Sequence, residues 1–267
     1  MGRLSHLPGM KHIEAPGGFP QRRAAEVPTV TAAQMREIER IALEEFGLDI
    51  LQIMENVGRA VATLAMAMLG SQARHQRIVV LAGNGNKGGG GLCAVRHLVN
   101  AGFVVEPVLG AVEEEMPPAS RRQLAILREA GVLEPRDQET SELTLEDHLG
   151  RSDLVIDALV GYGLVGPPGG IAGAIVDLAN ASRRPILAVD VPTGVNATTG
   201  EPSDNAIHAC TTLAIDLPKV GLLEPQARAH SGELYLADIG IPRAVHARAG
   251  VAPADLFREG AIVRIKR

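Results

Sequence analysis

The stretch that decides the fold reads Gly83-Asn84-Gly85-Asn86-Lys87-Gly88-Gly89-Gly90-Gly91. The apolar run before it, residues 77–82, predicts a strand, and the run after it, residues 92–101, predicts a helix. A strand, a glycine-rich loop and a helix present backbone N–H groups and a helix N-terminus to an anion. The spacing Gly83-x-Gly85-x-x-Gly88 also matches the dinucleotide-binding fingerprint, a pattern that many glycine-rich turns share without binding a nucleotide.

The composition limits the class of protein. The 267 residues are 46% hydrophobic and 21% charged, which is typical of a soluble globular domain. Aromatic residues make up 2% and the net charge is −5, so we expect no nucleic-acid partner. The longest apolar run, residues 61–69, is too short to cross a membrane, and no signal peptide is visible, so we expect no membrane association and a cytoplasmic protein. Cys93 and Cys210 are interpreted as small buried side chains.

Predicted strands and helices alternate along the chain. Apolar runs predict further strands at residues 103–109, 153–157, 185–190, 211–216 and 233–238. Helical periodicity predicts helices at residues 31–47, 51–69, 89–101, 116–130, 141–149 and 170–180, the first opened by a capping box at Thr31 and Gln34. This alternation predicts an α/β fold, with a mostly parallel sheet between two layers of helices. We interpret residues 1–26 as a flexible leader, residues 27–242 as the domain and residues 243–267 as a tail.

Unusual residues follow three of the predicted strands. The first strand leads into the glycine-rich loop, and the strand at residues 153–157 ends in Asp157 and a second Gly161-x-Gly163-x-x-Gly166 pattern. The strand at residues 185–190 ends in Asp190 and is followed by Thr193. An aspartate at a strand end often only caps the next helix. Because the carboxyl ends of parallel strands share one edge of a sheet, we expect these groups to converge in a single crevice.

The converging groups indicate a phosphate-bearing, nucleotide-like small molecule. Backbone N–H groups would bind its phosphates, and a carboxylate would contact a sugar hydroxyl or act as a general acid or base. The sequence contains no P-loop ending in Gly-Lys-Ser or Gly-Lys-Thr, no zinc-type Cys/His spacing and no recognisable nucleophilic triad.

The sequence resembles the NAD(P)H-hydrate epimerases, that is, the YjeF N-terminal domain. The resemblance covers nearly all of residues 27–242. It is carried by six ordered motifs: residues 51–60, the loop 83–91 with residues 94–98, residues 157–167, Asp190-Val-Pro-Thr-Gly194, residues 218–222 and residues 237–242. It implies a Rossmann-like three-layer αβα sandwich and a homodimer. It also implies an isomerase for the R and S forms of hydrated NADH and NADPH (NADHX and NADPHX), without an organic cofactor, whose product passes to a separate dehydratase.

The resemblance also implies roles for individual residues. Asp190 would be the catalytic acid and base, assisting loss and re-addition of the ring hydroxyl. Potassium would bind Asp157 and Thr193. The nucleotide would contact two loops and Asp190, that is, Asn86, Lys87, Gly88, Gly89, Gly90, Gly161, Tyr162, Gly163, Leu164, Val165, Gly166, Pro167 and Asp190.

The glycine-rich loop departs from the family pattern. The family loop reads Asn-Asn-Gly-Gly-Asp-Gly, whereas this chain has Lys87 at the position of a potassium-binding Asn and Gly90 at the position of the Asp. One hypothesis is that the Lys87 ammonium takes the place of potassium and faces Asp157; the other is that Lys87 points into solvent.

Two other functions stay open from the sequence. The first is an NAD-dependent dehydrogenase, in which Glu106 would bind a ribose. The second is a nucleotide-binding scaffold protein that has lost catalysis, which the altered loop favours. Hydride transfer would identify the first, and nucleotide binding without turnover would identify the second.

Overall fold

The computed structural model describes residues 17–70, 75–133, 144–164, 166–252 and 254–267. The strand before the glycine-rich loop, β2 (Arg77–Ala82), lies inside the sheet and is buried on both faces. Its alternate side chains enter two separate apolar clusters: Ile78 and Val80 face one cluster, and Val79 and Leu81 face the other. This alternation is the expected result of a strand covered by helices on both sides.

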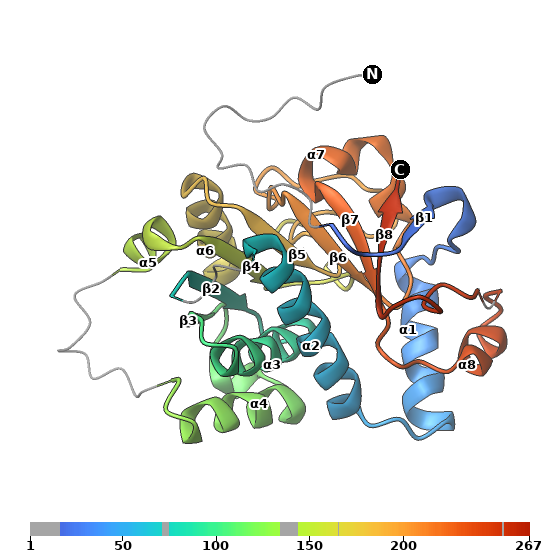
Figure 1. Cartoon of the computed structure of the whole chain (residues 1–267), viewed down its shortest axis with the longest axis horizontal. Coiled ribbons are helices and arrows are strands. Elements are labelled where there is room, and N and C mark those ends of the chain that lie inside the picture. Colours follow the sequence, from blue (N-terminus) through green and yellow to red (C-terminus); the bar gives the residue numbers. More distant parts are fainter. Residues whose placement is uncertain (1–16, 71–74, 134–143, 165, 253) are drawn as a thin grey trace.

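The described strands form one eight-stranded sheet of order β1-β8-β7-β6-β5-β4-β2-β3 (Figure 1). Neighbouring strands are parallel except β7 and β8, which are antiparallel. The mostly parallel sheet predicted from the sequence is therefore confirmed. The remaining strands span β1 (Gln21–Arg23), β3 (Val104–Leu109), β4 (Leu154–Ala158), β5 (Ile186–Val189), β6 (Thr211–Ile215), β7 (Glu233–Ala237) and β8 (Ile262–Lys266).

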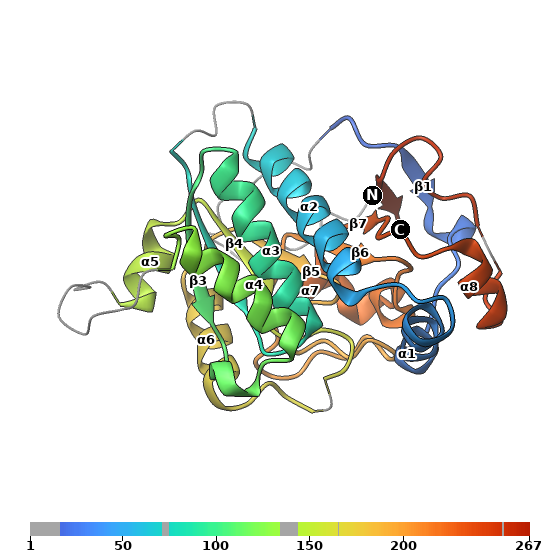
Figure 2. The same ribbon diagram turned by 90° about the horizontal axis from the view of Figure 1, so that it is seen from below.

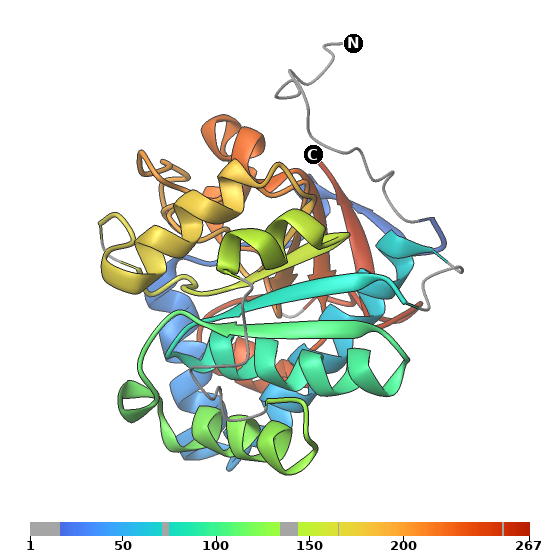
Figure 3. The same cartoon turned by 90° about the vertical axis from the view of Figure 1, so that its left-hand side faces the viewer.

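Helices cover both faces of this sheet. Figure 2 shows α2, α3 and α4 lying side by side on one face, and Figure 3 shows the three layers edge-on, with α5 and α6 on the opposite face. The predicted capping box at Thr31 and Gln34 opens α1. The helices span α1 (Ala32–Arg40), α2 (Ile50–Leu69), α3 (Asn86–Asn100), α4 (Pro118–Glu129), α5 (Leu145–Arg151), α6 (Gly170–Ala181), α7 (Arg228–Ser231) and α8 (Arg243–Arg248).

Both ends of the described chain differ from the sequence-based interpretation. Residues 21–23 of the supposed leader form β1, and residues 243–267, interpreted as a tail, contain α8 and β8. Both strands complete one edge of the sheet, because β8 pairs with β7 and with β1. A three-residue strand is too short to show an alternation of apolar and polar residues in the sequence, and β1 forms because it pairs with β8. Residues 1–16 lie outside the described part of the chain.

Within the described ranges, no helix is both long and apolar enough to cross a membrane. Cys93 is buried and Cys210 half-buried, and both are free thiols.

Candidate functional site

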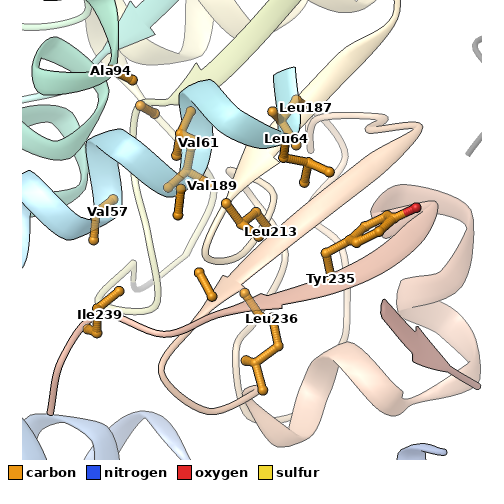
Figure 4. Close-up of a cluster of buried hydrophobic side chains, with 14 of the residues drawn as sticks. Val57, Val61, Leu64, Ala94, Leu187, Val189, Leu213, Tyr235, Leu236 and Ile239 are labelled. Atoms are coloured by element: carbon orange, nitrogen blue, oxygen red, sulfur yellow. The ribbon is translucent and has the colours of Figure 1, made fainter. Parts of the chain in front are cut away.

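A cavity of about 270 Å³ opens at the carboxyl edge of the sheet. The loops after β2, β4 and β5 meet there, as the strand-end argument predicted. The chain leaves β2 for β3 on one side and returns to β4 on the other, so the cavity lies at a topological switch point, where ligands bind in open α/β sheets. Its apolar wall continues into the core shown in Figure 4, where Val57, Val189 and Ile239 belong to both the wall and the core.

Six of the residues predicted to bind nucleotide line this cavity. They are Asn86, Lys87, Gly161, Tyr162, Gly163 and Asp190. Asn86 and Lys87 begin α3, whose N-cap residue, Gly85, supplies no side-chain cap. The first N–H groups of α3 therefore lie at the cavity without a capping side chain, which is the arrangement that binds anions.

The other predicted binding residues lie elsewhere. Gly88, Gly89 and Gly90 belong to α3, which begins three residues earlier than predicted, and they are buried without lining the cavity. A methyl group on Gly90 would lie 2.7 Å from a methyl of Val57 in α2, so this glycine allows two helices to pack closely. Leu164, Gly166 and Pro167 do not line the cavity either. Val165 lies outside the described residues.

Lys87 reaches from α3 to the ends of β4 and β5. Its Nζ lies 3.3 Å from Oδ2 of Asp157 and 3.3 Å from Oγ1 of Thr193. It donates hydrogen bonds of 2.9 Å to the carbonyl oxygens of Val160 and Val191. Thr193 also donates from its backbone N–H and its hydroxyl to Asp157, at 2.8 and 2.7 Å. The two predicted potassium ligands and Lys87 therefore form one buried cluster beneath the cavity.

Asp190 presents a carboxylate to the cavity at the end of β5. Its φ of 67° is in the left-handed region, which is unusual for a residue with a side chain and is often found at functional sites. Oδ2 accepts a hydrogen bond of 3.2 Å from the backbone N–H of Tyr162. Oδ1 pairs with Nζ of Lys219 at 2.6 Å, and both side chains are almost fully buried. The predicted catalytic carboxylate is therefore held from two sides.

Lys219 and Glu39 also line the cavity, although neither is among the site residues predicted from the sequence. Lys219 follows β6, the neighbour of β5, so the strand-end argument could have been extended to it. Its Nζ lies 5.4 Å from the centre of the Tyr162 ring. Glu39 projects from α1, one turn after the buried Met35. This i, i+4 spacing places both residues on the same face of the helix, and it could have indicated that Glu39 faces the site.

Glu39 and Tyr162 form a second pair of titratable groups in the cavity wall. The Tyr162 hydroxyl donates a hydrogen bond of 2.6 Å to Oε2 of Glu39. Burial raises the pKa of Glu39, and the hydrogen bond from Tyr162 opposes that change. Burial, followed by the charge of Glu39, raises the pKa of the Tyr162 hydroxyl. A carboxyl group with a raised pKa suits proton transfer near neutral pH.

One other cluster of metal-ligating types occurs among the described residues. Glu55, Cys93 and His97 approach one another between α2 and α3. Arg96 pairs with the same Glu55 carboxylate, and His97 Nε2 lies 2.9 Å from Glu55 Oε1. Burial and the nearby Glu55 raise the pKa of the Cys93 thiol to about 12. The cluster therefore resembles an ion-pair network that joins two helices more than a metal centre.

Comparisons with known proteins agree with this architecture. The family model described as YjeF-related protein N-terminus matches residues 50–221. A protein from Dehalogenimonas lykanthroporepellens named NAD(P)H-hydrate epimerase is 40% identical over 250 residues, covering 92% of this chain and 96% of that protein. One of the same name from Rhodopirellula baltica is 34% identical, covering 81% of this chain and 86% of that protein.

Longer relatives and a solved structure extend the comparison. A bifunctional NAD(P)H-hydrate repair enzyme Nnr from Moorella thermoacetica is 35% identical, and the match covers 80% of this chain but only 41% of that enzyme. The crystal structure of a yeast protein superimposes with a TM-score of 0.73 at 22% identity, covering 88% of this chain and 99% of the yeast chain, which shows the shared fold. On the family model and the identities together, this chain belongs to the YjeF-related protein N-terminus family.

Proposed function

We propose that the chain is an NAD(P)H-hydrate epimerase, an isomerase that interconverts the R and S forms of hydrated NADH and NADPH. The similarity to proteins of that name over nearly their full length supports the reaction. The observation that carries the proposal is the cavity itself, where an uncapped helix N-terminus lies beside the Asp190–Lys219 pair. The first feature suits the phosphates of a nucleotide, and the second suits proton transfer at its reacting ring.

The chemistry requires one proton to be given and then taken back. The ring hydroxyl leaves as water when it is protonated, because the lone pair of the ring nitrogen forms a planar iminium. Water then adds to either face of the iminium and returns a proton. We assign this proton transfer to Asp190, with Lys219 holding its carboxylate in place at 2.6 Å. Glu39, which the Tyr162 hydroxyl contacts, is proposed to orient the substrate opposite Asp190.

The dehydrogenase alternative receives no support from the position of Glu106. This residue lies in the middle of β3, where it pairs in register with Val79, and it does not line the cavity. A ribose ligand in such enzymes sits instead near the carboxyl ends of the strands.

Assembly and location are also part of the proposal. We infer a homodimer from the family resemblance; exposed apolar side chains at the β3 edge, including Val104 and Val112, offer a surface for it. We infer a cytoplasmic location, which two free thiols suit because reducing compartments keep cysteines unpaired. We infer from the family resemblance that a separate dehydratase acts next, and the bifunctional name of the longer relatives agrees with a second repair activity beside this one.

A coupled assay tests the proposed function. Mixed R and S hydrated NADPH is incubated with a dehydratase specific for the S form, with and without this protein. We expect the R form to be consumed faster when the protein is present. If the protein binds the nucleotide without accelerating consumption of the R form, it is a nucleotide-binding scaffold protein and the proposed function is wrong.

A further inference from the structure

We infer that Lys87 supplies a built-in cation at the ends of β4 and β5, so that this protein takes no potassium ion at Asp157 and Thr193. The structural basis is the set of atoms around the Lys87 ammonium. Four oxygen atoms lie within 3.3 Å of Nζ: a carboxylate oxygen of Asp157, the hydroxyl of Thr193 and the carbonyls of Val160 and Val191.

This set of oxygens would suit a hard metal cation. Carboxylate, hydroxyl and carbonyl oxygens are the ligands that such ions prefer, and no nitrogen or sulfur ligand takes part. The place that an ion would occupy is filled by Nζ, because the same four oxygens already surround it. Potassium therefore does not fit this site while the Lys87 side chain occupies it.

The position of Lys87 in the first turn of α3 makes a charged ammonium costly there, so its oxygen partners matter. A cation in the first turn of a helix is repelled by the positive end of the helix dipole. Only 7% of the Lys87 side chain is exposed, so the ammonium also loses most of its contact with water. Burial lowers the pKa of Lys87, and the charges of Asp157 and Asp190 oppose that change. The oxygen atoms that surround Nζ offset part of both costs, since a buried charge is tolerated only when it is paired and hydrogen-bonded.

A built-in cation has a consequence that a bound ion does not. An ion bound from solution stabilises the folded protein by an amount that rises with its concentration. A cation attached to the chain needs no ion from solution, so we expect stability to be independent of the potassium concentration. Removing the lysine side chain beyond Cβ should open a space lined by these four oxygens, which a free cation could then enter.

The test compares thermal unfolding of three proteins over a series of potassium chloride concentrations. Choline chloride keeps the ionic strength constant. The proteins are the wild type, Lys87→Ala, which opens the space, and Lys87→Met, which fills it without a charge. The readout is the unfolding temperature, which does not depend on whether the proposed epimerase activity is correct.

We expect the wild type to show no change specific to potassium. Lys87→Ala should unfold about 6–20 °C below the wild type, because an unpaired buried carboxylate remains. Potassium or methylammonium should then raise its unfolding temperature by about 3–7 °C in a saturable manner. Lys87→Met should be destabilised without recovery. A saturable, potassium-specific rise in the wild type would overturn the inference, and so would a Lys87→Ala protein that folds and does not respond.

Discussion

Replacing Asp190 by Asn tests the assignment of the proton-transfer group. Asn has nearly the shape of Asp, so the carbonyl oxygen of its amide can still accept the hydrogen bond from the Tyr162 N–H. The change removes the negative charge that faces Lys219 at 2.6 Å and the site from which a proton is given and recovered. Loss of a general acid or base lowers a rate by about 10²–10⁴-fold, or about 2.7–5.4 kcal/mol in activation free energy.

The same change also affects stability, and the assay must separate the two effects. Leaving the Lys219 ammonium buried and unpaired costs about 3–5 kcal/mol of folding free energy. Asp216→Asn is a matched control, because Asp216 follows β6, has a φ of 63° and pairs with His246 at 2.9 Å without lining the cavity. Both variants are assayed for epimerisation below their measured unfolding temperatures.

The expected pattern is selective. Asp190→Asn should lose about 10²–10⁴-fold in kcat, whereas Asp216→Asn should stay within about threefold of the wild type although it is also destabilised. Near wild-type kcat in a folded Asp190→Asn protein would refute the assignment of Asp190. Equal losses in both variants would show that the rate follows stability and not the carboxylate.

Three further predictions concern other parts of the structure. Burial raises the pKa of Glu39, so the folded protein holds this proton more tightly than the unfolded chain does. The wild type should therefore lose stability relative to Glu39→Gln as the pH rises from the ordinary glutamate pKa of about 4.3 through the raised value. Parallel curves of unfolding temperature against pH for the two proteins would contradict this. Gly161→Ala places a methyl group 3.1 Å from Oδ2 of Asp190 and should lower kcat/KM about 10–100-fold. Gly169→Ala is the control, because its methyl group would have no neighbouring atom within 4 Å, and it should leave kcat/KM unchanged. Equal activities of the two variants would show that the close approach of Gly161 to Asp190 is unimportant. Deleting residues 262–267 removes three buried apolar side chains of β8 and should lower the free energy of unfolding by about 5–9 kcal/mol, which is comparable to the whole stability of a domain. We therefore expect the truncated protein to be unfolded. A circular dichroism spectrum of a folded protein would contradict the role given to this strand.

The central part of the fold could be predicted from the sequence. Strands such as β2 and β4 are apolar almost throughout, and the polar or glycine-rich segments that follow them mark their ends. The parallel arrangement then places Lys87, Asp157 and Asp190 at one edge without knowledge of any distance. Local patterns and one rule of topology are enough to predict this arrangement.

The remainder depends on contacts between distant segments. The pairing of β1 with β8 joins the two ends of the described chain, and neither strand has a pattern of its own that requires it. The glycines at 88–90 indicate a loop by their composition, but they lie in α3, where Gly89 and Gly90 pack closely against Met54 and Val57 of α2. Glu39 enters the site only because α1 lies beside the loop that carries Tyr162, which local periodicity cannot show.

The most direct test of the proposed function follows interconversion itself in isotopically labelled water. The pure S form of hydrated NADPH is incubated with the protein in ¹⁸O-labelled water. The R and S forms are then separated, and the ¹⁸O content of each is measured by mass spectrometry. We expect the R form to appear faster than in buffer alone, and both forms to gain one labelled oxygen at the accelerated rate. Appearance of the R form at the rate seen in buffer alone would contradict the proposed function.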